Sequence, residues 1–276
     1  MKKIEHLING KLNSNFVNNT SSVFNPATGE EASQVVLGTE KCVQDAVNSA
    51  KKAYLSWSAE TPLMRSRKMF KLKEIIESRK NELAELITLE HGKTFDDALG
   101  EVGRGLEVVE FACGIPNLLA GNYTSEVGRS IDSWSDNQPL GIVAGITPFN
   151  FPVMVPLWMF PIAIACGNCF ILKPSERDPS STLLLAQMVL DAGFPPGVLN
   201  VVNGGKEAVD AILKNKDISA VSFVGSTPIA HYIYQEAAKY GKKVQAMGGA
   251  KNHMVVMPDA CLLYTSDAAD EITGVD

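Results

Sequence analysis

Residues 141–175 read "GIVAGITPFNFPVMVPLWMFPIAIACGNCFILKPS", and this stretch decides the fold. A short β-branched run is followed by an apolar stretch of helical length and then by a second β-branched run. Because residues 153–172 carry no charge, a membrane span is an alternative. Pro156, Pro161 and the Gly167-Asn168 turn signal instead favour a buried helix, a turn and a buried strand.

The same alternation of strand and helix continues to residue 247. Further strands are expected at 198–204, 220–226 and 243–247, and helices at 181–193, 206–215 and 228–241. Strands that are apolar on both faces and alternate with helices predict an α/β fold with a doubly wound parallel sheet. We therefore interpret 141–260 as a Rossmann-like nucleotide-binding core.

The first 140 residues are expected to pack on this core and contribute to it. Residues 1–37 indicate short strands and turns, and residues 39–57 have helical spacing. One long amphipathic helix is predicted from about 62 to 89, and another over 95–112. The segment "NQPLG" at 137–141 marks the boundary.

Composition excludes some functions. The 276 residues are 45% hydrophobic and 20% charged, with a net charge of -6, which disfavours a nucleic-acid partner. Five cysteines, an odd number, and an N-terminus without an apolar signal core indicate a reducing, cytoplasmic setting. No metal site is expected, because "CGNC" at 166–169 has no second pair for zinc. Its redox spacing is an alternative to small buried hydrophobes.

Polar groups follow the predicted strands, and ligands of such sheets bind at the carboxyl ends of strands. "TPFN", "KPSE", "VNGG", "VGST" and "MGGAKN" all lie there. Asn150 stands in an apolar run, so its amide is expected to be buried and to need partners, either its own backbone or a ligand in a pocket.

Other candidates each have two interpretations. Ser226 can cap its helix or help to bind an anion, and there is no G-x-G-x-x-G fingerprint. Lys173 and Glu176 can bind ribose hydroxyls or form a solvated turn. Arg104 can be a surface side chain or a carboxylate clamp. His253 is expected to be a packing residue rather than a base.

Together the motifs "PFNFPVMVPLWMFPIAIACGN", "LKPSERDP", "DAGFPPGVLNVVNG", "FVGST" and "GAKNHMVVMPDA" resemble the NAD-dependent aldehyde dehydrogenase superfamily. The resemblance covers residues 1–260 and is closest to the CoA-acylating methylmalonate-semialdehyde branch. It implies that the Asn150 amide donates to the oxyanion of a thiohemiacetal in a dry site, and that Arg104 holds the substrate carboxylate. It further implies that NAD contacts Thr147, Phe149, Lys173, Glu176, Arg177, Gly225, Ser226 and Gly248.

One departure from the wider superfamily favours this branch. Hydrolytic members carry a glutamate where "MGGAK" has Met247, which cannot accept a proton. The resemblance therefore implies coenzyme A as co-substrate. Methylmalonate semialdehyde would be oxidised with loss of carbon dioxide to propionyl-CoA, and malonate semialdehyde to acetyl-CoA, as in valine and inositol catabolism. A homo-oligomer, dimer or tetramer, is expected for the full-length protein, with no membrane partner.

The nucleophile of the family lies in a G-x-R-C-type motif that this chain does not contain. Residues 261–276, "CLLYTSDAADEITGVD", resemble a translated sequencing adapter, so we expect a truncated chain with a non-native tail. Cys261 has no motif that supports catalysis. The chain itself is expected to be inactive and prone to aggregation. The alternatives are a hydrolytic aldehyde dehydrogenase and a non-catalytic nucleotide-binding module.

Overall fold

The computed structural model describes residues 2–15, 17–250, 252–253 and 255–259, and its centre is a seven-stranded sheet. The order is β12-β11-β8-β9-β10-β2-β3. Its strands are β2 (His6–Ile8), β3 (Lys11–Asn13), β8 (Ile142–Ile146), β9 (Cys169–Lys173), β10 (Leu199–Val201), β11 (Ile218–Val224) and β12 (Lys243–Met247). The last five are mutually parallel, as predicted, whereas β2 pairs antiparallel with β10 and with β3.

The helices between the parallel strands cover both faces of the sheet. They are α6 (Met154–Ala165), α7 (Ser180–Asp191), α8 (Lys206–Lys214) and α9 (Thr227–Lys239). The chain runs outward from β8 through β9 to β10, then returns to the other side of β8 through β11 and β12. Right-handed crossovers in opposite directions place α6 and α7 on one face and α8 and α9 on the other. The direction reverses between β8 and β11, where open sheets of this kind form a ligand crevice.

The N-terminal helices add to the helical covering of both faces. They are α1 (Glu40–Trp57), α2 (Pro62–Ser78), α3 (Lys80–His91), α4 (Phe95–Cys113) and α5 (Ile115–Leu118). Helix α1 packs on β9 and β10 beside α8, whereas α2 and α4 pack on α6. The first 140 residues therefore contact the parallel sheet both directly and through α6.

The prediction of one continuous helix from 62 to 89 is wrong. Arg79, with φ -116° and ψ 17°, ends α2 and precedes α3. Its guanidinium pairs with Glu82 at 2.8 Å and with Asp191 of α7 at 3.4 Å. Both helices pack on α4 and α7, but α2 also contacts α6, whereas α3 also contacts β4 (Val17–Asn25). Tertiary packing here overrides a local pattern that contains neither glycine nor proline from residue 63 to residue 89.

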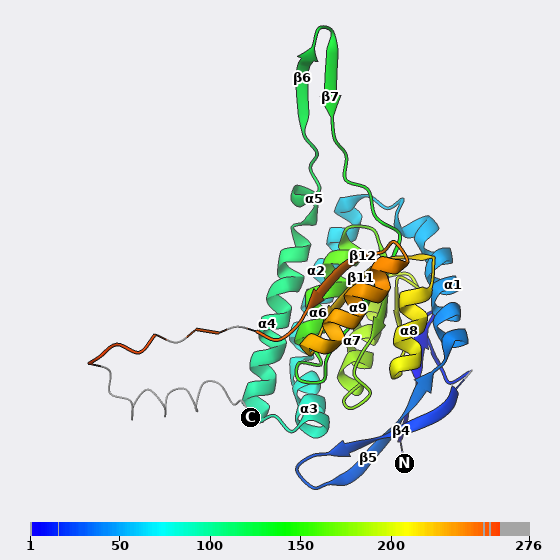
Figure 1. Cartoon of the computed structure of the whole chain (residues 1–276), viewed down its shortest axis with the longest axis vertical. Helices are drawn as coiled ribbons and strands as arrows, with labels where there is room; N and C mark the ends of the chain where they lie inside the picture. Colours follow the sequence, from blue (N-terminus) through cyan, green and yellow to red (C-terminus); the bar gives the residue numbers. More distant parts are fainter. Residues whose placement is uncertain (1, 16, 251, 254, 260–276) are drawn as a thin grey trace.

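Two smaller sheets lie at opposite ends of the molecule (Figure 1). One has the order β1-β5-β4, with β1 (Lys2–Ile4) and β5 (Glu30–Gly38). The other is a hairpin of β6 (Tyr123–Gly128) and β7 (Ile131–Trp134) that projects away from the body. Residues 113–136 carried no predicted element, so this hairpin is a finding of the structure.

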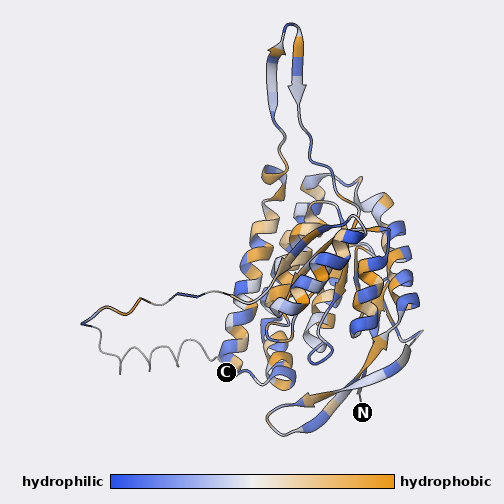
Figure 2. Cartoon of the chain, in the orientation of Figure 1, coloured by the Kyte–Doolittle hydropathy of each residue, from blue (hydrophilic) through white to orange (hydrophobic). Residues whose placement is uncertain are grey.

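The apolar run at 153–172 is largely buried, with Trp158 exposed, and it forms a helix, a turn and a strand as predicted. Figure 2 shows that hydrophobic residues concentrate on the central strands and on helix α6. The Trp57 indole N–H donates to the Ile164 carbonyl at 2.9 Å, and Arg65 Nε donates to the Ala165 carbonyl at 2.7 Å, which holds the end of α6. Among the described residues, no helix combines the length and apolarity that crossing a bilayer requires.

Candidate functional site

The register of the parallel strands brings the predicted site residues to one edge of the sheet. Ile146 pairs with Lys173 on one side and with Phe223 on the other, and Val224 pairs with Met247. The residues that follow the four strand ends, Ile146, Lys173, Val224 and Met247, therefore leave the sheet at nearly the same level. They include Thr147, Gly225 and Gly248. These residues follow β8, β11 and β12, and the strand order reverses between β8 and β11.

Two side-chain hydroxyls at this edge have no hydrogen-bond partner among the residues that the structure describes. Thr147 is buried; its N–H donates to the Lys173 carbonyl at 3.1 Å, but its Oγ1 has no partner among the described residues. Ser226 precedes α9, and its exposed hydroxyl makes no capping bond to that helix. The alternative of an ordinary capping serine is therefore not observed. An unpartnered buried hydroxyl and an uncapped helix start both fit a polar, anionic ligand.

Gly225 and Gly248 lie in tight space near Thr147 and Ser226. A Cβ on Gly225 would lie 2.4 Å from the Phe223 ring, and a Cβ on Gly248 would lie 3.0 Å from Thr227 Oγ1. That hydroxyl accepts a hydrogen bond from the Gly249 N–H at 3.0 Å. The start of α9 and the end of β12 are thus joined, with no space for side chains between them.

Lys173, the last residue of β9, forms an ion pair with Glu176, with Nζ 3.3 Å from Oε2. Lys173 is buried, and burial lowers the pKa of its ammonium, an effect that Glu176 opposes. The alternative of a fully solvated turn is therefore wrong for Lys173. Arg177 is exposed and places its guanidinium 4.9 Å from the centroid of the Phe149 ring.

Asn150 is exposed, so the expectation of a buried, dry amide is wrong for this chain. Phe149, which lies in the same bend after β8, is also exposed. Within the described residues, no hydrogen bond to the Asn150 side-chain amide is found. The amide is free to donate to a ligand at the surface of the fragment.

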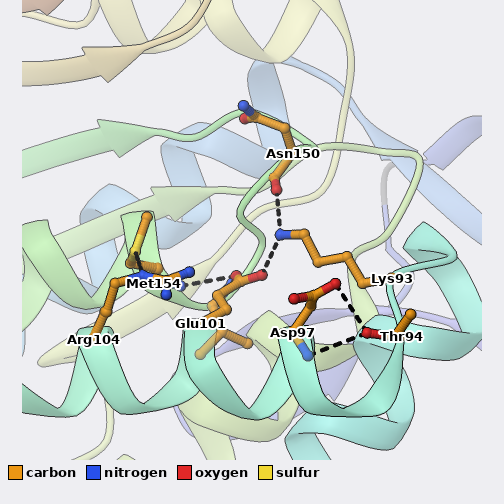
Figure 3. Close-up of polar contacts among 8 residues, drawn as sticks. Lys93, Thr94, Asp97, Glu101, Arg104, Asn150 and Met154 are labelled. Atoms are coloured by element: carbon orange, nitrogen blue, oxygen red, sulfur yellow. Dashed lines mark hydrogen bonds and ion pairs between the residues drawn. The ribbon is translucent and has the colours of Figure 1, made fainter. Parts of the chain in front are cut away.

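The loop that carries Asn150 is anchored by residues from α4 and from the segment before it (Figure 3). Lys93 Nζ donates to the Asn150 carbonyl at 2.7 Å and pairs with Glu101 Oε2 at 2.6 Å. The other oxygen of Glu101 accepts hydrogen bonds from the N–H groups of Val153 at 2.9 Å and of Met154 at 3.1 Å. The loop is therefore held at Asn150 and at the point where it enters α6.

Arg104 lies one turn beyond Glu101 on α4 and is exposed (Figure 3). Its Nε lies 3.4 Å from the Met154 sulfur. In the described part of the chain it forms no ion pair. A guanidinium without a carboxylate partner, next to the anchored loop, can bind an anionic substrate group.

A cleft of about 820 Å³ lies beneath the loop, and Asn150 and Glu176 contribute to its lining. His91 stacks on Phe149 with the ring centroids 6.1 Å apart. Burial, together with the Lys93 ammonium, lowers the pKa of His91. Asp178 is buried in the same wall, and burial raises the pKa of its carboxyl to about 8. The cleft therefore combines aromatic surface with groups of both charges.

The described cysteines do not supply a nucleophile. Cys42, Cys113, Cys166 and Cys169 are free thiols. Burial raises the pKa of all four, to about 12 for Cys42 and Cys169, so they remain protonated at neutral pH. The prediction that Cys166 and Cys169 are not a redox pair is consistent with this burial. Cys261 and the predicted tail at 261–276 lie outside the described residues.

Two further expectations can be compared with the structure. His253 is exposed, so the predicted packing role is wrong, because the chain leaves the body after β12. The expected lack of a metal site stays a prediction; the described residues contain no cluster of three or more histidine, cysteine or carboxylate side chains that could hold a metal ion.

Lys93 and Glu101 were not predicted as site residues. The segment "HGKT" at 91–94 signals in the sequence only the end of a helix. A signal was nevertheless present, because Glu101 occupies the buried face of α4 between Ala98 and Gly105. A carboxylate within an apolar helical stripe needs a partner, and that requirement could have identified it.

Comparison with known proteins gives one consistent result. Residues 14–272 match the Aldehyde dehydrogenase family. Malonate-semialdehyde dehydrogenase of Pseudomonas aeruginosa is 55% identical over 262 residues, which cover 95% of this chain and 52% of that protein. Malonate-semialdehyde dehydrogenase 1 of Bacillus thuringiensis is 50% identical, with coverage of 96% and 54%. The chain thus spans about half the length of the curated relatives it matches.

Solved structures agree with these relatives. Methylmalonate-semialdehyde dehydrogenase from Oceanimonas doudoroffii superposes with a TM-score of 0.93 at 57% identity, covering 97% of this chain and 55% of that one. A Sinorhizobium meliloti protein described as a methylmalonate-semialdehyde dehydrogenase, solved with NAD, gives 0.94 at 54% identity with the same coverage. The chain belongs to the aldehyde dehydrogenase family, and its fold is that of the NAD-dependent methylmalonate-semialdehyde dehydrogenases over the matched half.

Proposed function

We propose that this chain binds NAD at the carboxyl edge of its sheet and supplies the oxyanion donor of a CoA-acylating methylmalonate-semialdehyde dehydrogenase. The observation that carries the proposal is the convergence of Thr147, Lys173, Gly225 and Ser226 at the reversal between β8 and β11. The unpartnered Thr147 hydroxyl and the uncapped Ser226 fit a dinucleotide.

Each side chain has a distinct proposed role. Lys173 and Glu176 bind the adenosine ribose, where the carboxylate would repel a 2′-phosphate and favour NAD over NADP. Ser226 and the start of α9 bind the pyrophosphate. Bound NAD would supply a hydride acceptor. Phe149 and Arg177, which contact each other, and Gly248 complete the cofactor surface.

Substrate binding and activation are assigned to the loop before α6 and to the helix beside it. The Asn150 amide donates to the oxygen that becomes negative when a thiolate attacks the aldehyde carbon. Arg104 holds the carboxylate of the semialdehyde. The attacking cysteine would come from the rest of the protein, because three of the four described thiols are buried, Cys166 is half-buried, and the raised pKa values keep all four protonated.

Met247 supports coenzyme A rather than water as the acyl acceptor. It ends β12 at the edge that carries the cofactor residues, and its thioether cannot activate water. We further propose that methylmalonate semialdehyde yields propionyl-CoA and carbon dioxide, in a cytoplasmic homo-oligomer. On this proposal residues 1–276 alone do not turn over substrate, and residues 261–276 are a non-native tail.

The test is the CoA dependence of turnover by the full-length protein. Methylmalonate semialdehyde and NAD should give sustained NADH and propionyl-CoA only when CoA is present. Without CoA, NADH should stop at about one equivalent per active site. Asn150→Ala should lower kcat by about 100- to 1,000-fold. Sustained turnover to a free acid without CoA would establish the hydrolytic alternative. Turnover by residues 1–276 alone would refute the proposal that the attacking cysteine lies elsewhere in the protein.

A further inference from the structure

Glu101 is a fully buried carboxylate that caps a helix other than its own. Helix α6 has no side-chain cap from its N-cap residue, Val153. The N–H groups of Val153 and Met154 instead donate to Glu101 Oε1 at 2.9 and 3.1 Å. The first N–H groups of a helix have no partner within the helix, and the helix dipole favours an anion there. Glu101 thus fixes the start of α6 from the neighbouring helix α4.

The second oxygen of Glu101 orients Lys93. Oε2 lies 2.6 Å from Lys93 Nζ, and this pair is almost closed to solvent, with side-chain exposures of 0% for Glu101 and 16% for Lys93. The same ammonium donates to the Asn150 carbonyl at 2.7 Å and lies 3.9 Å from the centroid of the Phe151 ring. Lys93 is therefore held by one charge while it contacts the backbone of Asn150 and the ring of the next aromatic residue.

The side chain of Asn150 depends on this backbone contact. The side chain is exposed and has no hydrogen bond among the described residues, so its direction is set by the main chain from which it projects (Figure 3). An oxyanion donor contributes most when it is already aimed before the reaction begins. The main chain of Asn150 is the part that Lys93 holds.

We propose that Lys93 and Glu101 are positioning residues that aim the Asn150 amide by linking its carbonyl to the start of α6. This inference rests on the proposed function of Asn150. It assigns the pair no contact with substrate and no proton transfer. The consequence is that Lys93 should affect the rate only while the Asn150 amide is present.

A double-mutant cycle in the full-length protein tests this dependence. Lys93→Met keeps an unbranched apolar stem beside Phe151 but removes the donor to Asn150. Asn150→Ala removes the amide and keeps the carbonyl that Lys93 contacts. We expect Lys93→Met to lower kcat by about 10- to 100-fold, since a misplaced donor loses most of its contribution. In the Asn150→Ala background the same substitution should change kcat by less than about threefold.

Controls separate positioning from general stability. Lys73→Met removes an ion pair of equal length, 2.6 Å to Glu77 on α2, and should leave kcat unchanged. Glu101→Gln keeps an acceptor for α6 but removes the charge that holds Lys93, and it should lower kcat in the same dependent way. Lys93→Arg, which restores a donor, should recover part of the rate. Melting temperatures of all variants report whether folding is retained.

The outcomes distinguish the inference from the function on which it rests. Equal losses from Lys93→Met with and without the Asn150 amide, or no loss at all, would overturn the positioning role. A normal kcat for Asn150→Ala alone would instead overturn the oxyanion role of Asn150. A second measurement uses residues 1–276 themselves: Lys93→Met should lower the NMR order parameter of the Asn150 backbone N–H from about 0.85 to below about 0.6, and an unchanged value would contradict the anchor.

Discussion

His6 is a buried histidine in β2 whose Nδ1 accepts a hydrogen bond from the Asn203 N–H at 3.0 Å. Burial lowers the pKa of His6 to about 4. The unfolded chain takes up this proton near pH 6.5, whereas the folded chain resists it, so acid favours unfolding. The stability is fully present above about pH 6.5 and is lost as pH falls toward 4, by up to about 3 kcal/mol.

Urea unfolding between pH 4 and pH 7.5 measures this effect. His6→Asn keeps an acceptor near the position of Nδ1 and should flatten the acid limb of the stability curve. His231→Asn, at an exposed position on α9, is the matched control and should retain the limb. If His6→Asn and the native chain lose stability in parallel below pH 6.5, protonation of His6 is not the cause.

Asp178 should have the opposite dependence on pH. Burial, reinforced by Glu90 and Glu101, raises the pKa of Asp178 to about 8, and neither carboxyl oxygen has a well-oriented hydrogen-bond donor among the described residues. Since the unfolded pKa is near 3.9, the folded chain loses stability as pH rises from about 4 through 8. Asp178→Asn should therefore raise the unfolding free energy at pH 8.5 by about 1–3 kcal/mol and change it little at pH 5. Thermal melts at both values check this, and an equal effect at the two pH values would contradict it.

The sequence placed some candidate residues correctly at the sheet edge and misjudged the surroundings of others. The strand exits identified Thr147, Lys173 and Ser226, because the residue that follows a strand is fixed by local pattern. Exposure of Asn150 was not predictable from its apolar neighbours, since it depends on the direction in which the chain bends after β8. The partner of Glu101 also required the fold, because the start of α6 lies about fifty residues away along the chain.

At the scale of elements, the end of α3 depends on Gly92. This residue has φ of 89°, and a Cβ there would lie 2.7 Å from Pro26. Gly92→Ala should therefore lower the unfolding free energy by about 1–3 kcal/mol, through left-handed backbone strain and the clash. Gly103→Ala is the control, because it lies in α4 with no atom near the added methyl group, and it should be neutral or stabilising by up to about 1 kcal/mol. Chemical denaturation of both variants tests the contrast, which fails if they change stability alike.

The sequence predicted whether a segment is a helix or a strand more reliably than it predicted where a helix is interrupted. The strands and helices after residue 141 were each signalled by period and by turn residues, and the structure has them within a few positions. The break at Arg79 was not signalled, because no glycine or proline marks it and its contact with Asp191 of α7 joins residues far apart in sequence. The hairpin of β6 and β7 exposes Tyr123 and Trp134 and pairs chiefly with itself, so its short strands gave no clear alternation of buried and exposed positions.

At the scale of the molecule, the parallel sheet was predicted but its order was not, because strand pairing joins residues far apart in sequence. The order places the reversal between β8 and β11, which locates the crevice. A second cavity, of about 610 Å³, lies between α6 and strands β11 and β12, and its apolar lining includes the partly exposed Trp158 and Met247. Such a surface supports the expectation that residues 1–276 aggregate, which stays a prediction.

The most direct test of the central claim, that the carboxyl edge of this sheet binds NAD, is calorimetric titration of residues 1–276 with NAD and NADP. We predict that one NAD binds per chain and that NADP binds at least about tenfold more weakly because of Glu176. Lys173→Met should weaken NAD binding at least about tenfold, whereas Lys73→Met should leave the affinity for NAD unchanged. A folded chain that binds no NAD, or binds NAD and NADP equally and independently of Lys173, would contradict it.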